Sequence, residues 1–236
     1  FKSRNKILYK MGEVELQPNN GLLIIHAVIN IYGDAANDDL SFRVAKDIQD
    51  YWNNAEGKTA INNGWFSKKI YRVVFKIEGK FYRELTPQMV FENTGPRNNY
   101  FRIEEYARGN ISFVDGINSN TGYFKLENLL DNSSTAAHEF GHTIGLDHPH
   151  DLDIRGRGTP GIMYPRGTWV DPEYQYYPEV APGEKGGTLN PFTRKVLQKD
   201  IDDLRLNDLG FNENGFAILG DFTSVWHEKH WADTDQ

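Results

Sequence analysis

The feature that most constrains this chain is a short stretch in which three histidines and a glutamate stand at fixed offsets, His138-Glu139-Phe140-Gly141-His142-Thr143-Ile144-Gly145-Leu146-Asp147-His148. Side chains four residues apart on a helix point the same way, because 3.6 residues complete one turn. We therefore expect His138 and His142 to share one face of a helix, where they can hold one metal ion. Gly145 accepts the left-handed conformation of a sharp helix exit, so the chain can turn back and bring His148 to the same ion.

These side chains have the chemistry of a catalytic metal site. Three neutral imidazoles leave Zn²⁺ an open fourth position for water. Glu139 is offset from the metal-facing line, so it can reach that water as a general base without binding the metal. The short pattern H-E-x-x-H also arises by chance. The longer pattern is more specific, because it includes three of the seven histidines in the chain at fixed spacings. An amphipathic helix with surface histidines is the less favoured interpretation.

This stretch resembles the signature of the metzincin metallopeptidases, H-E-x-x-H-x-x-G-x-x-H followed by a methionine turn. The turn is matched by Gly161-Ile162-Met163-Tyr164-Pro165. The resemblance implies that Met163 packs beneath the metal as an apolar floor and does not bind it. The segments Gly-Leu-Asp-His and Met-Tyr-Pro resemble the corresponding sequences of matrixins. Pro149, after the third histidine, is more similar to the sequence of serralysins. Pro165 stands where astacins and serralysins carry a tyrosine that can bind zinc.

The resemblance implies an endopeptidase that hydrolyses protein or peptide substrates. It implies one catalytic zinc ion bound by His138, His142 and His148, with Glu139 as the catalytic residue. It leaves calcium open, and no Asp-rich repeat of the serralysin type is present. Two alternatives stay open: a toxin-type protease with a single target protein, and a non-catalytic binding module that keeps a zinc fold. Glu139 disfavours the binding module, because a structural zinc site does not need that carboxylate.

Composition excludes several other classes. The 236 residues carry a net charge of −7, which gives a nucleic-acid partner no general electrostatic support. No apolar run reaches the ~18 residues of a membrane span, and the opening Phe1-Lys2-Ser3-Arg4-Asn5-Lys6 lacks the apolar core of a signal segment. The absence of cysteine excludes disulfides and thiolate zinc ligands. We expect a secreted monomer, present here as a mature or excised catalytic domain.

Hydrophobic periodicity predicts an α+β fold. Alternating apolar residues indicate a long interior strand over 22–32, in which His26 is structural. Helical spacing predicts a helix over 37–54 that packs on the sheet. A second strand over 71–77 is expected to turn at Glu78-Gly79-Lys80 into a hairpin. Further short strands are expected over 100–106, 111–114 and 123–126. The resemblance implies that a late strand pairs with substrate at the sheet edge, and both 111–114 and 123–126 remain candidates.

After the third histidine, the sequence no longer shows the regular apolar periodicity of the first part of the chain. The aromatic residues of 164–177 suit either packing or the wall of a substrate pocket. Asn190-Pro191 predicts the start of one long helix near 191–209. His227 and His230 are expected in a surface tail. We expect a single metzincin-like domain over 1–236, with a twisted mixed sheet and two backing helices in an N-terminal lobe (about 1–148). A smaller irregular lobe (about 149–236) should hold the long helix, and the active site should lie in the cleft between the lobes.

Overall fold

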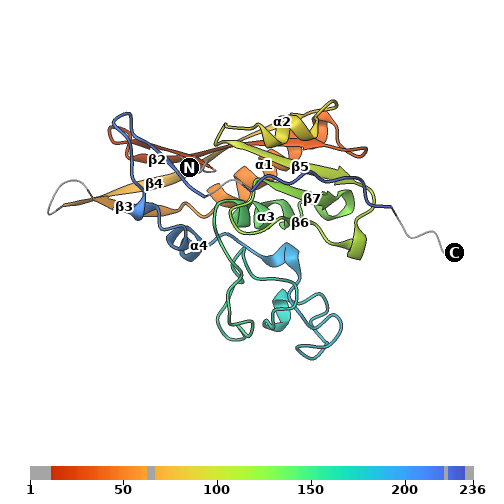
Figure 1. Ribbon diagram of the computed structural model, residues 1–236. Helices are drawn as coiled ribbons and strands as arrows, with labels where there is room; N and C mark the ends of the chain where they lie inside the picture. Colours follow the sequence, from red (N-terminus) through yellow and green to blue (C-terminus); the bar gives the residue numbers. More distant parts are fainter. Residues whose placement is uncertain (1–11, 63–66, 221–222, 232–236) are drawn as a thin grey trace, which may run out of the picture.

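The computed structural model describes residues 12–62, 67–220 and 223–231, and the opening segment 1–6 discussed above lies outside them. In this part of the chain, eight strands form one mixed sheet (Figure 1). The strands are β1 (Glu13–Gln17), β2 (Leu22–Tyr32), β3 (Lys58–Asn62), β4 (Lys68–Phe81), β5 (Asn98–Glu104), β6 (Phe113–Val114), β7 (Thr121–Lys125) and β8 (Phe216–Ile218). The α-helices are α1 (Asp38–Asn53), α2 (Pro87–Phe91), α3 (Thr135–Thr143) and α4 (Gln198–Asp203). The predicted α+β class is confirmed.

The strand predicted over 22–32 is confirmed as β2, which lies at the centre of the sheet. β4 runs parallel to it along one side, while β1 (antiparallel) and β5 (parallel) share its other side. Beyond β5 come β7 and then β6, so β6 is an edge strand. The apolar face of β2 is buried in the main core, through Leu23, Ile25, Ala27, Ile29 and Ile31. His26 points to the other face and bonds Glu15 of β1 at 2.9 Å, which supports a structural role.

Helix α1 matches the predicted 37–54 helix and packs on β4. Asn37 caps it, because its side-chain oxygen accepts a hydrogen bond from the Leu40 N–H at 2.8 Å. The predicted hairpin at 78–80 is wrong, since β4 continues without a turn to Phe81. The glycine that prompted it allows close packing instead: a Cβ on Gly79 would overlap the carbonyl oxygen of Ser41 in α1. Gly79 therefore lets the helix approach the strand.

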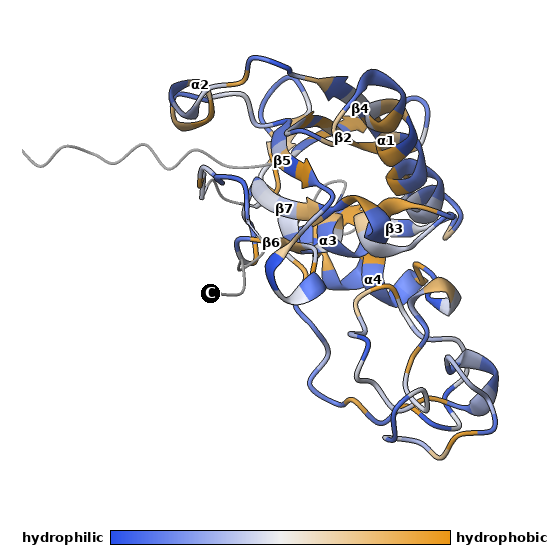
Figure 2. Ribbon diagram, turned by 90° about the vertical axis from the view of Figure 1, so that its right-hand side faces the viewer, coloured by the Kyte–Doolittle hydropathy of each residue, from blue (hydrophilic) through white to orange (hydrophobic). Residues whose placement is uncertain are grey.

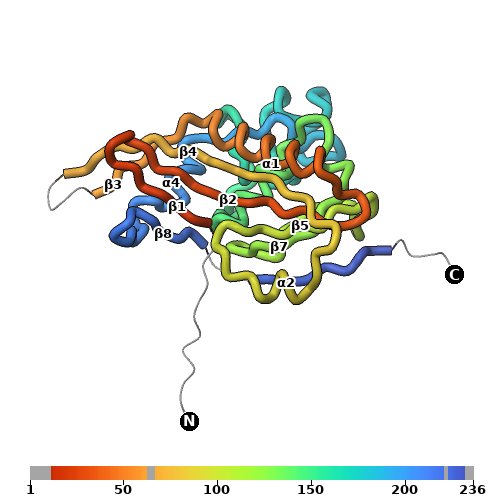
Figure 3. Tube along the Cα trace, turned by 90° about the horizontal axis from the view of Figure 1, so that it is seen from above, coloured from red at the N-terminus to blue at the C-terminus, as the bar shows by residue number. Residues whose placement is uncertain are grey.

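The opposite face of the sheet is covered by α2 and by the last described segment, 223–231. Val90 of α2 packs with Tyr32, and Trp226 stacks on the same tyrosine with ring centroids 4.8 Å apart. His230 stacks on Tyr123 of β7, and His227 pairs with Asp115. Figure 3 shows this segment in blue beside α2 and β7. The segment lies at the surface as predicted, because none of its described residues is buried, but its contacts with Tyr32, Tyr123 and Asp115 hold it against the sheet.

The lower part of the molecule, from His148 to about residue 209, consists mostly of loops (Figure 2). The predicted long helix over 191–209 is wrong. Asn190 caps only a 3-10 turn (Pro191–Thr193), and α4 begins at Gln198. Between them the chain is extended, with the Lys195 N–H donating to the Pro160 carbonyl at 3.0 Å. Tertiary hydrogen bonds thus replace the helical ones in this stretch.

β8 pairs with β1, so the chain returns to the sheet after residue 209. The division into one domain with two lobes stays a prediction. In the described residues, no helix is both long enough and apolar enough to cross a bilayer.

Candidate active site

Helix α3 lies between the core and a cleft. Its inner side consists of fully buried residues such as Ala137 and Phe140. Phe140 meets Trp52 of α1 edge to face, with ring centroids 6.1 Å apart. The Trp52 indole N–H donates to the Ala137 carbonyl at 3.1 Å, which ties the two helices together. With this face committed to the core, the histidine positions of α3 turn toward the cleft.

The end of α3 brings the third histidine back. Gly145 has φ of +105°, as its predicted role in the helix exit requires. Its N–H donates to the His142 carbonyl at 3.1 Å, and the Leu146 N–H donates to the Gly141 carbonyl at 3.0 Å. These are the two hydrogen bonds of a Schellman motif, which closes a helix and reverses the chain. His148 therefore lies against the two histidines of the helix.

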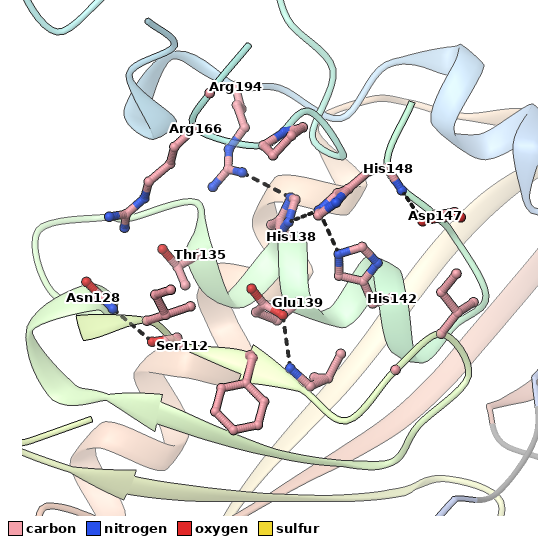
Figure 4. Close-up of a pocket in the computed structure, with 17 residues that line it drawn as sticks. Ser112, Asn128, Thr135, His138, Glu139, His142, Asp147, His148, Arg166 and Arg194 are labelled. Carbon is pink, nitrogen blue, oxygen red and sulfur yellow. Dashed lines mark hydrogen bonds between the residues drawn. The ribbon is translucent and has the colours of Figure 1, made fainter. Parts of the chain in front are cut away.

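The structure brings His138, His142 and His148 together (Figure 4). The Nε2 atom of His148 lies 3.1 Å from the Nε2 atoms of both helix histidines. Nitrogens bound to one tetrahedral zinc at 2.0–2.1 Å lie roughly 3.3 Å apart. The donor set therefore fits a single zinc ion. In the described part of the chain, this is the one group of three or more ligand-type side chains that could hold a metal ion.

Backbone carbonyls orient two of the imidazoles. Nδ1 of His138 lies 2.7 Å from the Ile162 carbonyl, and Nδ1 of His142 lies 2.7 Å from the Leu146 carbonyl. A carbonyl can only accept, so each Nδ1 carries the proton and each Nε2 keeps its lone pair for a metal. Burial lowers the pKa of all three histidines, which favours the neutral, ligating form.

Glu139 lies beside the histidines on the floor of the cleft. It is 8% exposed, and its Oε2 accepts a hydrogen bond from the Val114 N–H of β6 at 3.1 Å. Burial raises its pKa to about 8, against the opposing effects of the Val114 N–H and the charges of Arg194 and Arg166. Glu139 is thus next to the ligand cluster and is suited to exchange a proton near neutral pH.

The predicted methionine turn lies directly beneath α3. The Tyr164 N–H closes the turn onto the Gly161 carbonyl at 3.3 Å. Met163 is 3% exposed, and a Cβ on Gly141 would overlap its sulfur atom. The turn therefore supports the site twice, because Met163 packs under the helix and the preceding Ile162 carbonyl orients His138.

The cleft above these residues has a volume of about 590 Å³. One wall is the edge formed by 111–117, which includes β6, and the opposite wall is formed by 165–167 and Arg194. Of the two edge-strand candidates, 111–114 lies at the sheet edge, whereas 123–126 overlaps β7, an interior strand. The aromatic residues of 164–177 do not line this cleft. Tyr164 and Tyr174 pack around Ile154, Val170 and Leu189 instead, in agreement with the packing interpretation.

Sequence reasoning missed Arg194 as a residue of the site and gave Arg166 no role in it. Arg194 was assigned to a helix that does not form, and its guanidinium instead lies beside the start of α3, where the residue is 4% exposed. Arg166 directly follows the methionine turn, where the family resemblance implies a pocket wall, and it lines the cleft together with Pro165 and Gly167. Asp147 also lines the cleft, at the end opposite the arginines (Figure 4).

Comparisons with known proteins give structural likenesses only. No protein-family model and no curated protein matches the sequence. The fold is similar to that of myroilysin, with a TM-score of 0.39 and 13% identity over 78% of this chain and 94% of that one. It is also similar to that of archaemetzincin from Methanopyrus kandleri, with a TM-score of 0.42 and 13% identity over 81% of this chain and 98% of that one. At these scores the likenesses carry no conclusion about activity.

Proposed function

We propose that this protein is a zinc-dependent endopeptidase of the metzincin type. The observation that carries the proposal is the convergence of three imidazole Nε2 atoms beside a buried carboxylate on the floor of an open cleft. A structural zinc site closes its coordination shell with protein ligands, whereas a catalytic one leaves a position open. Three histidines and an adjacent Glu139 match the catalytic case.

The roles of the residues follow from their placement. His138, His142 and His148 would hold the zinc ion. When bound, zinc acidifies water and polarises a carbonyl group. Glu139 takes a proton from the attacking water and passes it to the leaving amine, which needs a carboxyl group that can be both base and acid. A divalent cation nearby would lower the pKa of Glu139 and keep its carboxylate ready as the base.

The substrate would bind along the edge at 111–117. In the described chain β6 pairs with no strand other than β7. Its Val114 N–H donates to Glu139, so the edge at 111–117 would offer a substrate its other backbone groups. An extended peptide can add to such an edge as a further strand. This binding mode holds the backbone of the substrate and leaves its side chains to the walls. It supports cleavage within protein or peptide chains. We further propose a secreted monomer, with neither nucleic acid nor membrane as partner.

The alternatives predict different outcomes in one experiment. The protein is incubated with a denatured proteome, with and without a zinc chelator, and new chain termini are sequenced. Many new termini that disappear with the chelator are expected for a general endopeptidase. Cleavage confined to one protein of a native extract would indicate the toxin-type protease. Zinc binding without any new terminus would favour the non-catalytic module and overturn the proposal.

A further inference from the structure

The two ends of the cleft carry opposite charge. Arg166 and Arg194 line one end, with the neutral polar residues Ser112, Asn128 and Thr135, whereas Asp147 lines the other (Figure 4). Apart from Glu139 on the floor, none of the acidic residues that the structure describes lines the arginine end. The whole chain has a net charge of −7, so this local excess of positive charge runs against its general balance.

Arg194 is held in place by neutral acceptors. Its Nε donates to the Ser134 hydroxyl at 2.9 Å, and its Nη1 donates to the Tyr164 carbonyl at 3.0 Å. Ser134 is itself fixed, because its hydroxyl donates to the Pro191 carbonyl at 2.6 Å. Nη1 also lies 3.0 Å from Nδ1 of His138, but that nitrogen already donates its proton to Ile162. The guanidinium is therefore rigid before any ligand arrives.

The guanidinium of Arg194 makes no direct ion pair in the described chain, and the carboxylate of Glu139 acts on its charge only from beyond ion-pair distance. Among the described residues, no ion pair within 4.0 Å involves Arg194 or Arg166. Nη2 of Arg194 has no hydrogen-bond partner among the described residues. This atom is not one of the fully buried polar atoms without a partner, so it is accessible from the cleft. A buried charge without a contacting counter-ion is costly for a fold, and such groups gather at functional sites. A planar guanidinium with free donors matches a carboxylate.

We propose that the arginine end of the cleft binds a carboxylate of the substrate next to the scissile bond, so that the enzyme selects acidic residues there. This inference rests on the proposed peptidase function. Arg194 supplies rigid buried donors, and the exposed Arg166 supplies a second positive charge. A substrate strand antiparallel to β6 would place the acidic residue on the C-terminal side of the scissile bond.

The test measures binding, so that it does not depend on turnover. Glu139→Gln protein, loaded with zinc, is titrated with fluorescein-labelled peptides that differ only by Glu, Gln or Lys at the central position and are amidated at the C terminus. A Gln peptide that ends at this position with a free carboxylate separates a side-chain carboxylate from a terminal one. Charge-assisted hydrogen bonds predict binding of the Glu peptide about 10- to 100-fold tighter than binding of its amidated Gln counterpart.

Charge reversal supplies the variants. Arg166→Glu, at an exposed position, should abolish the preference for Glu and favour the Lys peptide. Arg43→Glu makes the same change on the exposed side of α1, outside the cleft, and should leave the preference intact. Arg194→Met should also lose the preference, but this buried position can affect folding, so Arg166 decides the outcome.

The two proposals fail in different ways. Equal binding of the Glu, Gln and Lys peptides, or a preference unchanged by Arg166→Glu, would overturn the carboxylate inference. Cleavage of all three peptides by the wild type at equal rates would do the same and leave the peptidase proposal intact. A wild type that binds the Glu peptide selectively but cleaves nothing would contradict only the peptidase proposal.

Discussion

Replacing Gly141 by alanine should destabilise the protein, although alanine is the better helix former. Helix propensity alone predicts a gain of about 1 kcal/mol. The new Cβ, however, would overlap Met163 Sδ and would lie 3.1 Å from Met163 Cε and 3.3 Å from Trp52 Cζ2. Trp52 is fully buried and anchored by its indole N–H, so it has little room to move. Overpacking of this kind costs roughly 1–3 kcal/mol. We expect Gly141→Ala to lower the free energy of unfolding.

A double-mutant cycle isolates the contact. Met163→Ala alone should cost about 2–5 kcal/mol, because it leaves a cavity under α3. In that background Gly141→Ala meets less crowding and should be neutral or stabilising by up to about 1 kcal/mol. The two substitutions should therefore couple by roughly 1–4 kcal/mol. Urea unfolding followed by tryptophan fluorescence measures each free energy.

The packing of the methionine turn predicts a second consequence. Displacement of Met163 should shift the neighbouring Ile162 carbonyl, which orients His138. Zinc affinity should therefore fall in Gly141→Ala and recover in the double variant. Met163→Leu keeps a similar volume and should not relieve the clash. If Gly141→Ala were as stable as the wild type, with unchanged zinc affinity, the contact between Met163 and α3 would be wrong.

Three further outcomes are expected, two from the site and one from the buried carboxyl group of Asp200 in α4. His148→Ala should retain zinc far less well in metal analysis, and full occupancy at unchanged affinity would refute its role as third ligand. Glu139→Ala should keep zinc and fold but hydrolyse peptides about 10²–10⁴-fold more slowly, mainly in kcat; a well-folded variant with the parent rate would exclude the general base. Burial raises the pKa of Asp200 from 3.8 to about 6. The native state then binds more protons than the unfolded state between these values, so stability should fall as pH rises through that window, by about 3 kcal/mol at 1.36 kcal/mol per pKa unit. Asp200→Asn should flatten this dependence in urea unfolding across the same pH range.

The cluster of three histidines could be predicted because all its determinants are local. His138 and His142 share a helix face through the 3.6-residue period, and Gly145 supplies the positive φ that turns the chain toward His148. The strand β2 and the helix α1 were equally predictable. Burial of one face makes apolar residues recur along the sequence with the period of a strand or of a helix. These features need no knowledge of distant residues.

The errors arose where distant contacts outweighed local preference. Gly79 looked like a turn residue, but close packing against α1 requires a missing side chain in a continuous strand. Asn190-Pro191 does begin a helical turn, but hydrogen bonds from Lys195 to Pro160, and from Arg194 to Ser134 and Tyr164, hold the following segment extended. The partners in these hydrogen bonds lie about 30 to 60 residues away along the chain, so a local sequence pattern cannot predict the bonds.

The sequence by itself determined the chemistry of the centre: three imidazoles, an adjacent carboxylate and an apolar methionine beneath them. Only the tertiary structure decided which strand forms the open edge and which side chains line the cleft beyond the motif. Arg194 belongs to the cleft because the loop after Asn190 packs against the start of α3. A motif on one helix specifies its own side chains through helical geometry, whereas a substrate wall is assembled from segments whose meeting depends on the packing of the whole chain.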